Sequence, residues 1–286
     1  MTNYLKPIEP VDYLVVGHIS QDIKPDGVVP GGTAAYSALT AQAFGLRVGI
    51  LSSYAPDAVL PNLGNIQVIN QVSEHSTVFH NQDLPSGRLQ HILSRAETLY
   101  PNLLPSTWKT AKIIHLGPIA NEVDLSFFKA FPDAFVGITP QGWFRAWDQQ
   151  GKISFTNFIE ASHFFQYADA VVLSIEDLDY NENIIAELVY NSRVLVVTEG
   201  ARGARVYWHG DVRNFRVEEV EEVDSTGAGD IFAAAFFIRL AYTRDPWGSA
   251  RFAANIATNS VTREGMQSAP TPDEIQDQII EIIQSD

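Results

Sequence analysis

The most informative part of the sequence is Asp224-Ser225-Thr226-Gly227-Ala228-Gly229-Asp230, which runs directly into the apolar sequence IFAAAFFIRLA over 231–241. Its two glycines permit a tight turn and the close approach of a ligand. The apolar run predicts a buried helix, and free N–H groups at the start of a helix form an anion pocket. Asp230 in the first turn can then face this pocket as a base, although an ordinary acidic helix start is the simpler interpretation of the stretch alone.

Short apolar runs on the amino-terminal side of this stretch predict buried parallel strands. They lie at 11–16, 48–51, 113–116, 134–138, 170–173 and 194–197. Helix-like stretches lie between or after them, at 33–44, 181–190 and 231–241. This alternation predicts an α/β fold with a doubly wound, mostly parallel sheet that is flanked by helices.

One segment departs from the alternation. Residues 76–80 and 88–93 have the pattern of two strands, joined across the turn-rich connector 83–87. Together with the exposed-looking stretch 20–30, this hairpin predicts a small β lid over the end of the sheet where ligands of such folds bind. We therefore expect one domain over residues 1–286, with a lid from about 18–31 and 74–96 inserted in it.

The composition favours small-molecule chemistry. The chain has 286 residues, of which 19 are basic and 34 acidic, so its net charge of -15 opposes binding to nucleic acid or to an anionic membrane. It has no cysteine, its first ten residues contain no apolar targeting core, and the apolar stretch 231–238 is too short to cross a bilayer. We therefore expect a cytoplasmic protein without nucleic-acid or membrane partners.

A second glycine motif, Gly31-Gly32, opens a predicted helix of small residues. Together with Gly17-His18-Ile19-Ser20-Gln21-Asp22 and 224–230, it resembles the ribokinase-like (PfkB) carbohydrate kinase family, and the resemblance spans nearly the whole chain. Within that family the chain is most similar to the myo-inositol kinase branch. The motifs of this closer resemblance are Val16-Gly17-His18, Asp22-Ile23, Ala35-Tyr36-Ser37-Ala38, Gln141-Gly142-Trp143-Phe144-Arg145 and Glu222-Val223-Asp224-Ser225-Thr226-Gly227.

The resemblance implies an ATP-dependent phosphotransferase that acts on a hydroxyl of a small polyol or sugar, with myo-inositol as the favoured acceptor and Mg²⁺ accompanying ATP. It makes Asp230 the base and places the anion hole at Gly227, Ala228 and Gly229. The implied acceptor-binding residues are Asp22, Gly31, Gly32, Tyr36, Gln141 and Arg145. The implied ATP-binding residues are Ser174, Thr198, Gly200, Gly203, Gly227, Gly229 and Asn255.

Two positions depart from the family pattern. Many relatives have Asn-x-x-Glu near the metal, whereas this chain has Ser174-Ile175-Glu176-Asp177, so Asp177 is the expected Mg²⁺ ligand. Tyr36 stands where sugar kinases of the family commonly have Asn, which argues against plain ribose as the acceptor. Asp224 and Thr226, with Gly265 nearby, occupy positions that bind a monovalent cation such as K⁺ in some relatives.

Several alternatives stay open at this stage. The acceptor could be a nucleoside or another sugar, or the chain could be a ligand-binding relative without catalysis. A dinucleotide-dependent oxidoreductase is disfavoured because no Gly-x-Gly-x-x-Gly follows the first strand, and no P-loop sequence occurs. Arg95 and Arg145 could reach inward or form surface salt bridges, and His18 could touch ligand or simply pack. An edge strand of the lid could pair with a second chain to form a homodimer.

Overall fold

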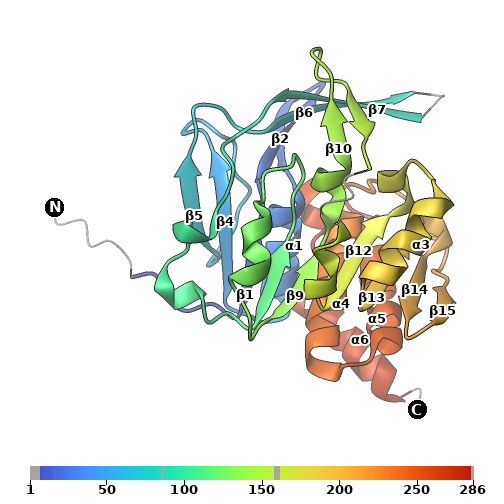
Figure 1. Ribbon diagram of the computed structural model, residues 1–286. Coiled ribbons are helices and arrows are strands. Elements are labelled where there is room, and N and C mark those ends of the chain that lie inside the picture. Colours follow the sequence, from blue (N-terminus) through green and yellow to red (C-terminus); the bar gives the residue numbers. More distant parts are fainter. Residues whose placement is uncertain (1–6, 85–86, 158–161, 285–286) are drawn as a thin grey trace.

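The computed structural model describes residues 7–84, 87–157 and 162–284. Its main sheet has nine strands in the order β15-β14-β13-β12-β9-β8-β1-β4-β5 (Figure 1). The strands are β1 Tyr13–Val16, β4 Val48–Tyr54, β5 Gln67–Val72, β8 Ile113–Leu116, β9 Phe135–Ile138, β12 Ala170–Ser174, β13 Val194–Thr198, β14 Ala204–Trp208 and β15 Asp211–Phe215. The six predicted strands pair in parallel, and only β14 and β15 run antiparallel to their neighbours. The predicted fold class is confirmed.

Helices cover both faces of this sheet. They are α1 Thr33–Ala43, α3 Glu182–Asn191, α4 Ala228–Thr243, α5 Pro246–Ser260 and α6 Pro272–Gln284, and short 3-10 helices occupy several connections. Along β1, Tyr13 and Val15 pack into the core beneath α1, α4 and α5, whereas Leu14 and Val16 pack into the core on the α3 side. This alternation buries every residue of the strand, which explains its continuous apolar sequence.

Helix α4 is the central helix of the fold. It begins three residues before the predicted range of 231–241 and ends two residues after it. Its residues from Ile231 to Ile238 are all buried, because the helix is apolar on every side. A Cβ built at Gly137 of β9 would lie 2.5 Å from the Phe237 ring, so this glycine lets α4 pack directly against the sheet.

A second sheet of four strands, in the order β3-β2-β6-β7, lies above one end of the main sheet (Figure 1). Its strands are β2 Ser20–Lys24, β3 Gly27–Gly31, β6 Val78–Leu84 and β7 Gly87–Ser94, and residues 85 and 86 of the predicted connector lie outside the described residues. The expected exposure of 20–30 is wrong for Ser20, Gln21 and Asp22, which are buried because β2 pairs with both β3 and β6. The division into one domain with an inserted lid stays a prediction.

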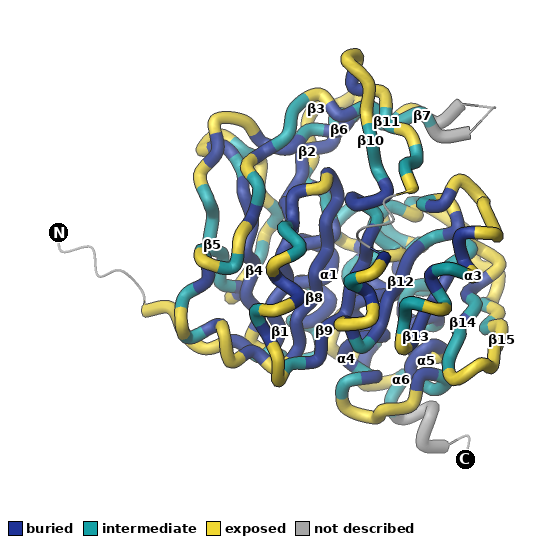
Figure 2. Tube along the Cα trace, viewed as in Figure 1, coloured by how far each residue is buried: buried dark blue, intermediate teal, exposed yellow. Residues whose placement is uncertain are grey.

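An additional hairpin, β10 Arg145–Trp147 and β11 Ile153–Phe155, stands beside this sheet and was not predicted. A β-bridge between His91 and Lys152 and a hydrogen bond of 2.9 Å from the Ile92 amide to the Gly151 backbone oxygen link it to β7. Figure 2 shows burial concentrated along the central strands and α4, while the exposed residues follow the loops. Within the described ranges, no helix combines the length and the apolar character that crossing a membrane would require.

Candidate active site

A cavity of about 900 Å³ lies where the four-stranded sheet, the β10-β11 hairpin and the starts of α1 and α4 meet. We call it the transfer cavity. Its polar lining residues include Ser20, Asp22, Thr33, Tyr36, Asn81, Gln90, Gln141, Arg145, Lys152, Ser154, Asp177, Thr226 and Asp230. Phe79, Leu89, Ile119, Phe144 and Phe155 supply apolar surface on the lid side. This combination of apolar walls and a few convergent polar groups is typical of a small-molecule site.

The start of α4 forms one end of the transfer cavity. Gly227 precedes the helix with a φ of 82°, a left-handed conformation that favours glycine, and a Cβ at this position would clash with the Tyr36 ring. A Cβ at Gly229 would instead meet open space. In the described part of the chain, no side chain caps this helix, but the Ala228 amide of the predicted anion hole donates to the backbone oxygen of Ser225 at 3.2 Å. The amides of Gly229 and Asp230 are therefore the ones open to an anion.

Asp230 lies in the first turn of α4, and its carboxylate lines the transfer cavity. The Thr33 hydroxyl donates a hydrogen bond of 2.6 Å to its Oδ1 atom. Burial raises the pKa of Asp230 to about 6, the hydrogen bond from Thr33 opposes this rise, and the nearby charge of Asp177 adds to it. A carboxyl group with this pKa is mostly ionised at neutral pH yet basic enough to take a proton from a hydroxyl.

Asp22 faces the transfer cavity from β2, in close contact with Gly31. A Cβ at Gly31 would collide with the Asp22 carboxylate, and Gly32 has a φ of 92° at the start of α1. The two glycines therefore allow the lid strand, its carboxylate and the helix start to come together. Of the predicted acceptor-binding residues, Gly31 packs against the Asp22 carboxylate, and the other five line the cavity.

Gln141 and Asp177 are joined to each other. The Gln141 Nε2 atom donates a hydrogen bond of 2.8 Å to Asp177 Oδ1, and the backbone N–H of Ser174 donates one of 2.9 Å to Asp177 Oδ2. Burial raises the pKa of Asp177, while the positive charge of Arg145 and these hydrogen bonds oppose the rise. Gln141 thus orients a carboxylate that faces the same cavity as Asp230.

Arg145 reaches into the transfer cavity from the start of β10. Its Nη1 atom donates to the backbone oxygen of Ile119 at 2.9 Å, and its guanidinium carbon lies 5.4 Å from the centroid of the Phe79 ring. Its positive charge opposes the rise that burial causes in the pKa of both Asp177 and Asp230. Arg145 is therefore placed to stabilise negative charge on a group that binds between these two carboxylates.

The described residues include no cluster of three or more His, Asp or Glu side chains suited to a metal ion. A Mg²⁺ ion usually keeps several waters and binds through one or two carboxylates plus substrate phosphates. Asp177 can serve as such a carboxylate, because Gln141 holds its side chain toward the transfer cavity. The residues present therefore fit a Mg²⁺ ion that is bound together with the nucleotide phosphates.

The residues of the predicted monovalent cation site lie together. Asp224 Oδ1 accepts from the Thr226 amide at 2.9 Å, and Asp224 Oδ2 accepts from the Gly265 amide at 3.0 Å. Burial alone would raise the pKa of Asp224, but these hydrogen bonds hold it below its usual value. The observed role of Asp224 is to tie two loops together, and the K⁺ site stays a prediction.

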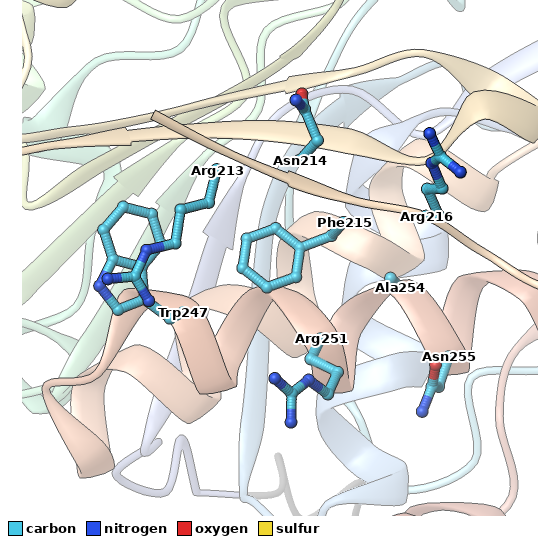
Figure 3. Close-up of a pocket in the computed structure, with 8 residues that line it drawn as sticks. All are labelled: Arg213, Asn214, Phe215, Arg216, Trp247, Arg251, Ala254 and Asn255. Carbon is cyan, nitrogen blue, oxygen red and sulfur yellow. The ribbon is translucent and has the colours of Figure 1, made fainter. Parts of the chain in front are cut away.

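The predicted ATP-binding residues lie in three places, of which the start of α4 holds Gly227 and Gly229. Ser174 and Thr198 are the last residues of β12 and β13, and Gly200 and Gly203 lie between β13 and β14. Within the described ranges, none of these four residues lines the transfer cavity. Asn255 instead lines a separate groove of about 440 Å³ between β15 and α5 (Figure 3). Its Nδ2 atom donates a hydrogen bond of 2.8 Å to Gln278 of α6.

This groove carries positive charge and aromatic surface. Arg213, Arg216 and Arg251 line it, and the Arg213 guanidinium lies 4.2 Å from the centroid of a Trp247 ring. Figure 3 shows Trp247 and Arg213 at one end of the groove and Asn255 and Arg216 at the other. Aromatic and cationic side chains of this kind can contact a nucleobase or a phosphate.

Sequence reasoning did not identify several lining residues. Thr33 directly follows the Gly31-Gly32 motif, and its place at the start of a predicted helix was the available indication. Asn81, Gln90 and Lys152 belong to no motif. Asn81 and Gln90 face each other across the β6-β7 pair, and Lys152 reaches the same cavity from the β10-β11 hairpin, which lies much later in the chain.

Arg95 and His18, for which the sequence left a ligand contact open, have structural roles. Arg95 donates from Nε to the backbone oxygen of Ala120 at 2.8 Å, so it holds a loop instead of reaching into the transfer cavity. The buried His18 ring pairs with Thr77 at 2.7 Å and with the backbone oxygen of Glu97 at 2.8 Å. His18 is therefore a packed histidine with both ring nitrogens engaged.

Comparison with known proteins gives consistent relatives. The family described as pfkB family carbohydrate kinase matches residues 144–274. The cytidine kinase of Thermococcus kodakarensis is 25% identical over 256 residues, which cover 79% of this chain and 87% of that protein. The fructokinase of Escherichia coli is 32% identical over 152 residues, or 48% of each chain.

A solved pyrophosphate-dependent kinase of the ribokinase family, in complex with a pyrophosphate analogue and myo-inositol, shares the fold. Its TM-score is 0.77 at 16% identity, with 93% of this chain and 99% of that chain covered.

Proposed function

Because the chain is a ribokinase-like kinase of the PfkB family, and therefore a phosphotransferase, we propose that it transfers the terminal phosphoryl group of ATP to a hydroxyl of a small polyol, with myo-inositol as the favoured acceptor. The observation that carries this proposal is the position of Asp230, whose carboxylate lines the transfer cavity beside the open amides at the start of α4.

The proposed reaction uses these groups in one displacement. The acceptor oxygen attacks the terminal phosphorus, the bond between that phosphorus and the bridging oxygen of ADP breaks, and the hydroxyl proton passes to Asp230. The amides of Gly229 and Asp230 and the charge of Arg145 stabilise negative charge on the transferred group. Asp177 would hold a Mg²⁺ ion that arrives with the nucleotide, and this ion would further neutralise the phosphates. Asp22 accepts hydrogen bonds from acceptor hydroxyls.

A polyol acceptor is supported by the polar side chains that converge on the transfer cavity. Asp22, Asn81 and Gln90 can accept hydrogen bonds from hydroxyl groups, and Ser154 can both donate and accept them. The motifs shared with the myo-inositol kinase branch and the fold shared with a kinase solved in complex with myo-inositol point in the same direction.

A nucleoside is the second candidate acceptor. The cavity of about 900 Å³ is large for a single cyclitol ring, and Phe79, Leu89 and Phe155 add apolar surface on the lid side. A nucleobase could use this surface, whereas a cyclitol would leave much of it uncovered. The similarity to a cytidine kinase over 79% of the chain favours the same alternative.

A panel of acceptors and donors tests the proposal. The acceptors are myo-inositol, ribose, fructose and cytidine, and each is offered with ATP and separately with pyrophosphate, while the phosphorylated product is measured. The highest kcat/KM with ATP and myo-inositol would support the proposal, and preference for cytidine would select the second candidate. Saturable acceptor binding in calorimetry without any product would indicate a non-catalytic relative, and turnover with pyrophosphate alone would replace ATP as the donor.

A further inference from the structure

The Thr33 hydroxyl is the group that fixes the orientation of Asp230 in this structure. Thr33 Oγ1 donates to Asp230 Oδ1 at 2.6 Å, across a sequence separation of 197 residues. Within the described residues, Asp230 Oδ2 accepts no hydrogen bond, and the carboxylate as a whole faces the transfer cavity. The two carboxylate oxygens of Asp230 therefore differ in this structure, because Oδ1 is held by Thr33 and Oδ2 is left for a substrate.

The position of Thr33 is itself fixed by packing. Thr33 is buried and is the first residue of α1, directly after Gly32, where a Cβ would lie 2.5 Å from the backbone oxygen of His18. On its other side, a Cβ at Gly117 would lie 2.5 Å from the Thr33 methyl group. Because glycines on both sides let the backbone approach this closely, the Thr33 side chain has little freedom to turn away from Asp230.

Further contacts along the same face of α1 hold the two helix starts together. Tyr36 covers Gly227, and the Ser37 hydroxyl donates to the Asp230 backbone oxygen at 3.4 Å. Residues 33, 36 and 37 lie on one side of a helix because of its 3.6-residue period. Thr33 is thus part of a rigid contact between α1 and α4, and it is the member that touches the carboxylate.

We propose that Thr33 is a positioning residue for phosphoryl transfer, because its hydroxyl holds Asp230 Oδ1 and leaves Oδ2 as the oxygen that takes the acceptor's proton. This inference rests on the proposed role of Asp230 as the base. The step balances as follows: the acceptor O–H bond breaks as the new O–P bond forms, and the proton ends on Oδ2. Thr33 donates to Oδ1 throughout, because that oxygen stays an acceptor in both protonation states.

The proposal has a consequence for the pH profile. The groups that act on the Asp230 carboxyl are Thr33 of α1, Asp177 of the 3-10 helix Ile175–Leu178 and Arg145 of β10. The buried tyrosines Tyr13 and Tyr36 also lie within range, and their raised pKa values keep them neutral near pH 7. Thr33 favours the ionised carboxylate, so its removal raises the pKa of Asp230 and moves the acid limb of the rate profile to higher pH.

The test compares three variants of the full-length chain in a kcat and pH-profile assay. Thr33→Val keeps the shape but removes the hydroxyl, and we expect kcat to fall about tenfold at pH 7 and the acid limb to rise by about one pH unit. Thr33→Ser keeps the hydroxyl and should restore both values to within a few-fold. Thr40→Val is the matched control on the same helix, because the buried Thr40 hydroxyl donates only to the Tyr36 backbone oxygen at 2.8 Å, and it should leave the acid limb in place.

The outcomes separate this inference from the proposed function. An unchanged acid limb in Thr33→Val, or an equal loss of activity in Thr33→Ser, would overturn the positioning role while Asp230 could still be the base. If Asp230→Asn keeps full turnover, the base assignment fails first and the inference fails with it. Circular dichroism of each variant shows whether a loss of rate reflects a loss of fold.

Discussion

The two ends of the transfer cavity are built in different ways. At the base end, the starts of α1 and α4 meet through Thr33, Tyr36, Gly227 and Asp230, with contacts so close that glycine is required. At the lid end, Asn81 and Gln90 come from the four-stranded sheet, and Lys152 and Phe155 come from the β10-β11 hairpin. The difference indicates that the base end is committed to one reaction, whereas the lid end can vary with the acceptor.

The largest expected effect is at the base end. Asp230→Asn removes the proton acceptor with little change of shape, so kcat should fall about 100-fold to 10,000-fold. Because its pKa is raised, the folded protein favours the protonated form of the Asp230 carboxyl. The contribution of Asp230 to the stability of the fold is therefore fully present below pH 3.8 and is lost as the pH rises through about 6. At pH 8 the variant should therefore unfold at the same temperature as the wild type or at a higher one. A dead variant with a lowered melting temperature would not support the role as base.

The next effect separates two glycines of the predicted anion hole. Gly227→Ala places a methyl group against the Tyr36 ring at a φ of 82°, so we expect about 1–3 kcal/mol of lost stability together with reduced activity. Gly229→Ala meets open space and should fold normally, but its methyl group would stand where the donor phosphate approaches, which should raise the donor KM about tenfold. Chemical denaturation and donor titration measure the two effects. An unchanged donor KM in Gly229→Ala would move the anion hole away from this turn.

A third expected effect is the dependence of the rate on pH. Because burial holds the pKa of Asp230 at about 6, kcat should be constant above pH 7 and fall about tenfold per pH unit well below pH 6. Rate measurements from pH 5 to pH 8 at saturating substrates check this. A limb near pH 4 would mean that the charge of Arg145 outweighs burial once substrates are bound.

The same comparison explains what could be predicted from the sequence. Six of the parallel strands were visible because a strand buried on both faces is continuously apolar. The parallel strand β5 was missed because it lies at the edge of the sheet and its residues are only partly buried. The base end was visible because tight turns leave glycine motifs beside Asp230. The contact between Thr33 and Asp230 was not, because it joins residues far apart in the chain and a single hydroxyl at a helix start has many ordinary uses. The β10-β11 hairpin was missed because strands of three residues are too short to show a period.

The antiparallel strands β14 and β15 show a further limit. Their residues are mostly polar or half exposed, since β15 is the edge of the sheet, next to the groove that contains Asn255, and β14 is the strand beside it. An edge strand lacks the apolar run that marks a central one. The exposed-looking sequence of β2 hid the burial of Asp22 for a different reason, because this burial depends on pairing with β6 from much later in the chain.

The smallest expected effect is at the lid end and concerns binding alone. Asn81 lies across from Gln90 in the β6-β7 pair, Gln90 Nε2 donates to Asn81 Oδ1 at 3.1 Å, and Gln90 Oε1 in turn accepts from Arg145 at 3.3 Å. Asn81→Leu keeps the size of the side chain but removes an acceptor from the cavity wall. The acceptor KM should rise about fivefold, with kcat changed less than twofold, because the loss applies equally to ground and transition states.

The matched control for this last variant is Gln82→Leu, one residue further along β6. Alternation along a strand points this side chain to the opposite face, and Gln82 is exposed and does not line the transfer cavity. Steady-state kinetics at varied acceptor concentration should show wild-type values for Gln82→Leu. Asn81→Leu could instead lower kcat and leave the acceptor KM unchanged. In that case the hydrogen bonds that link Asn81 through Gln90 to Arg145 stabilise the transition state, and the two ends of the cavity are coupled through the lid.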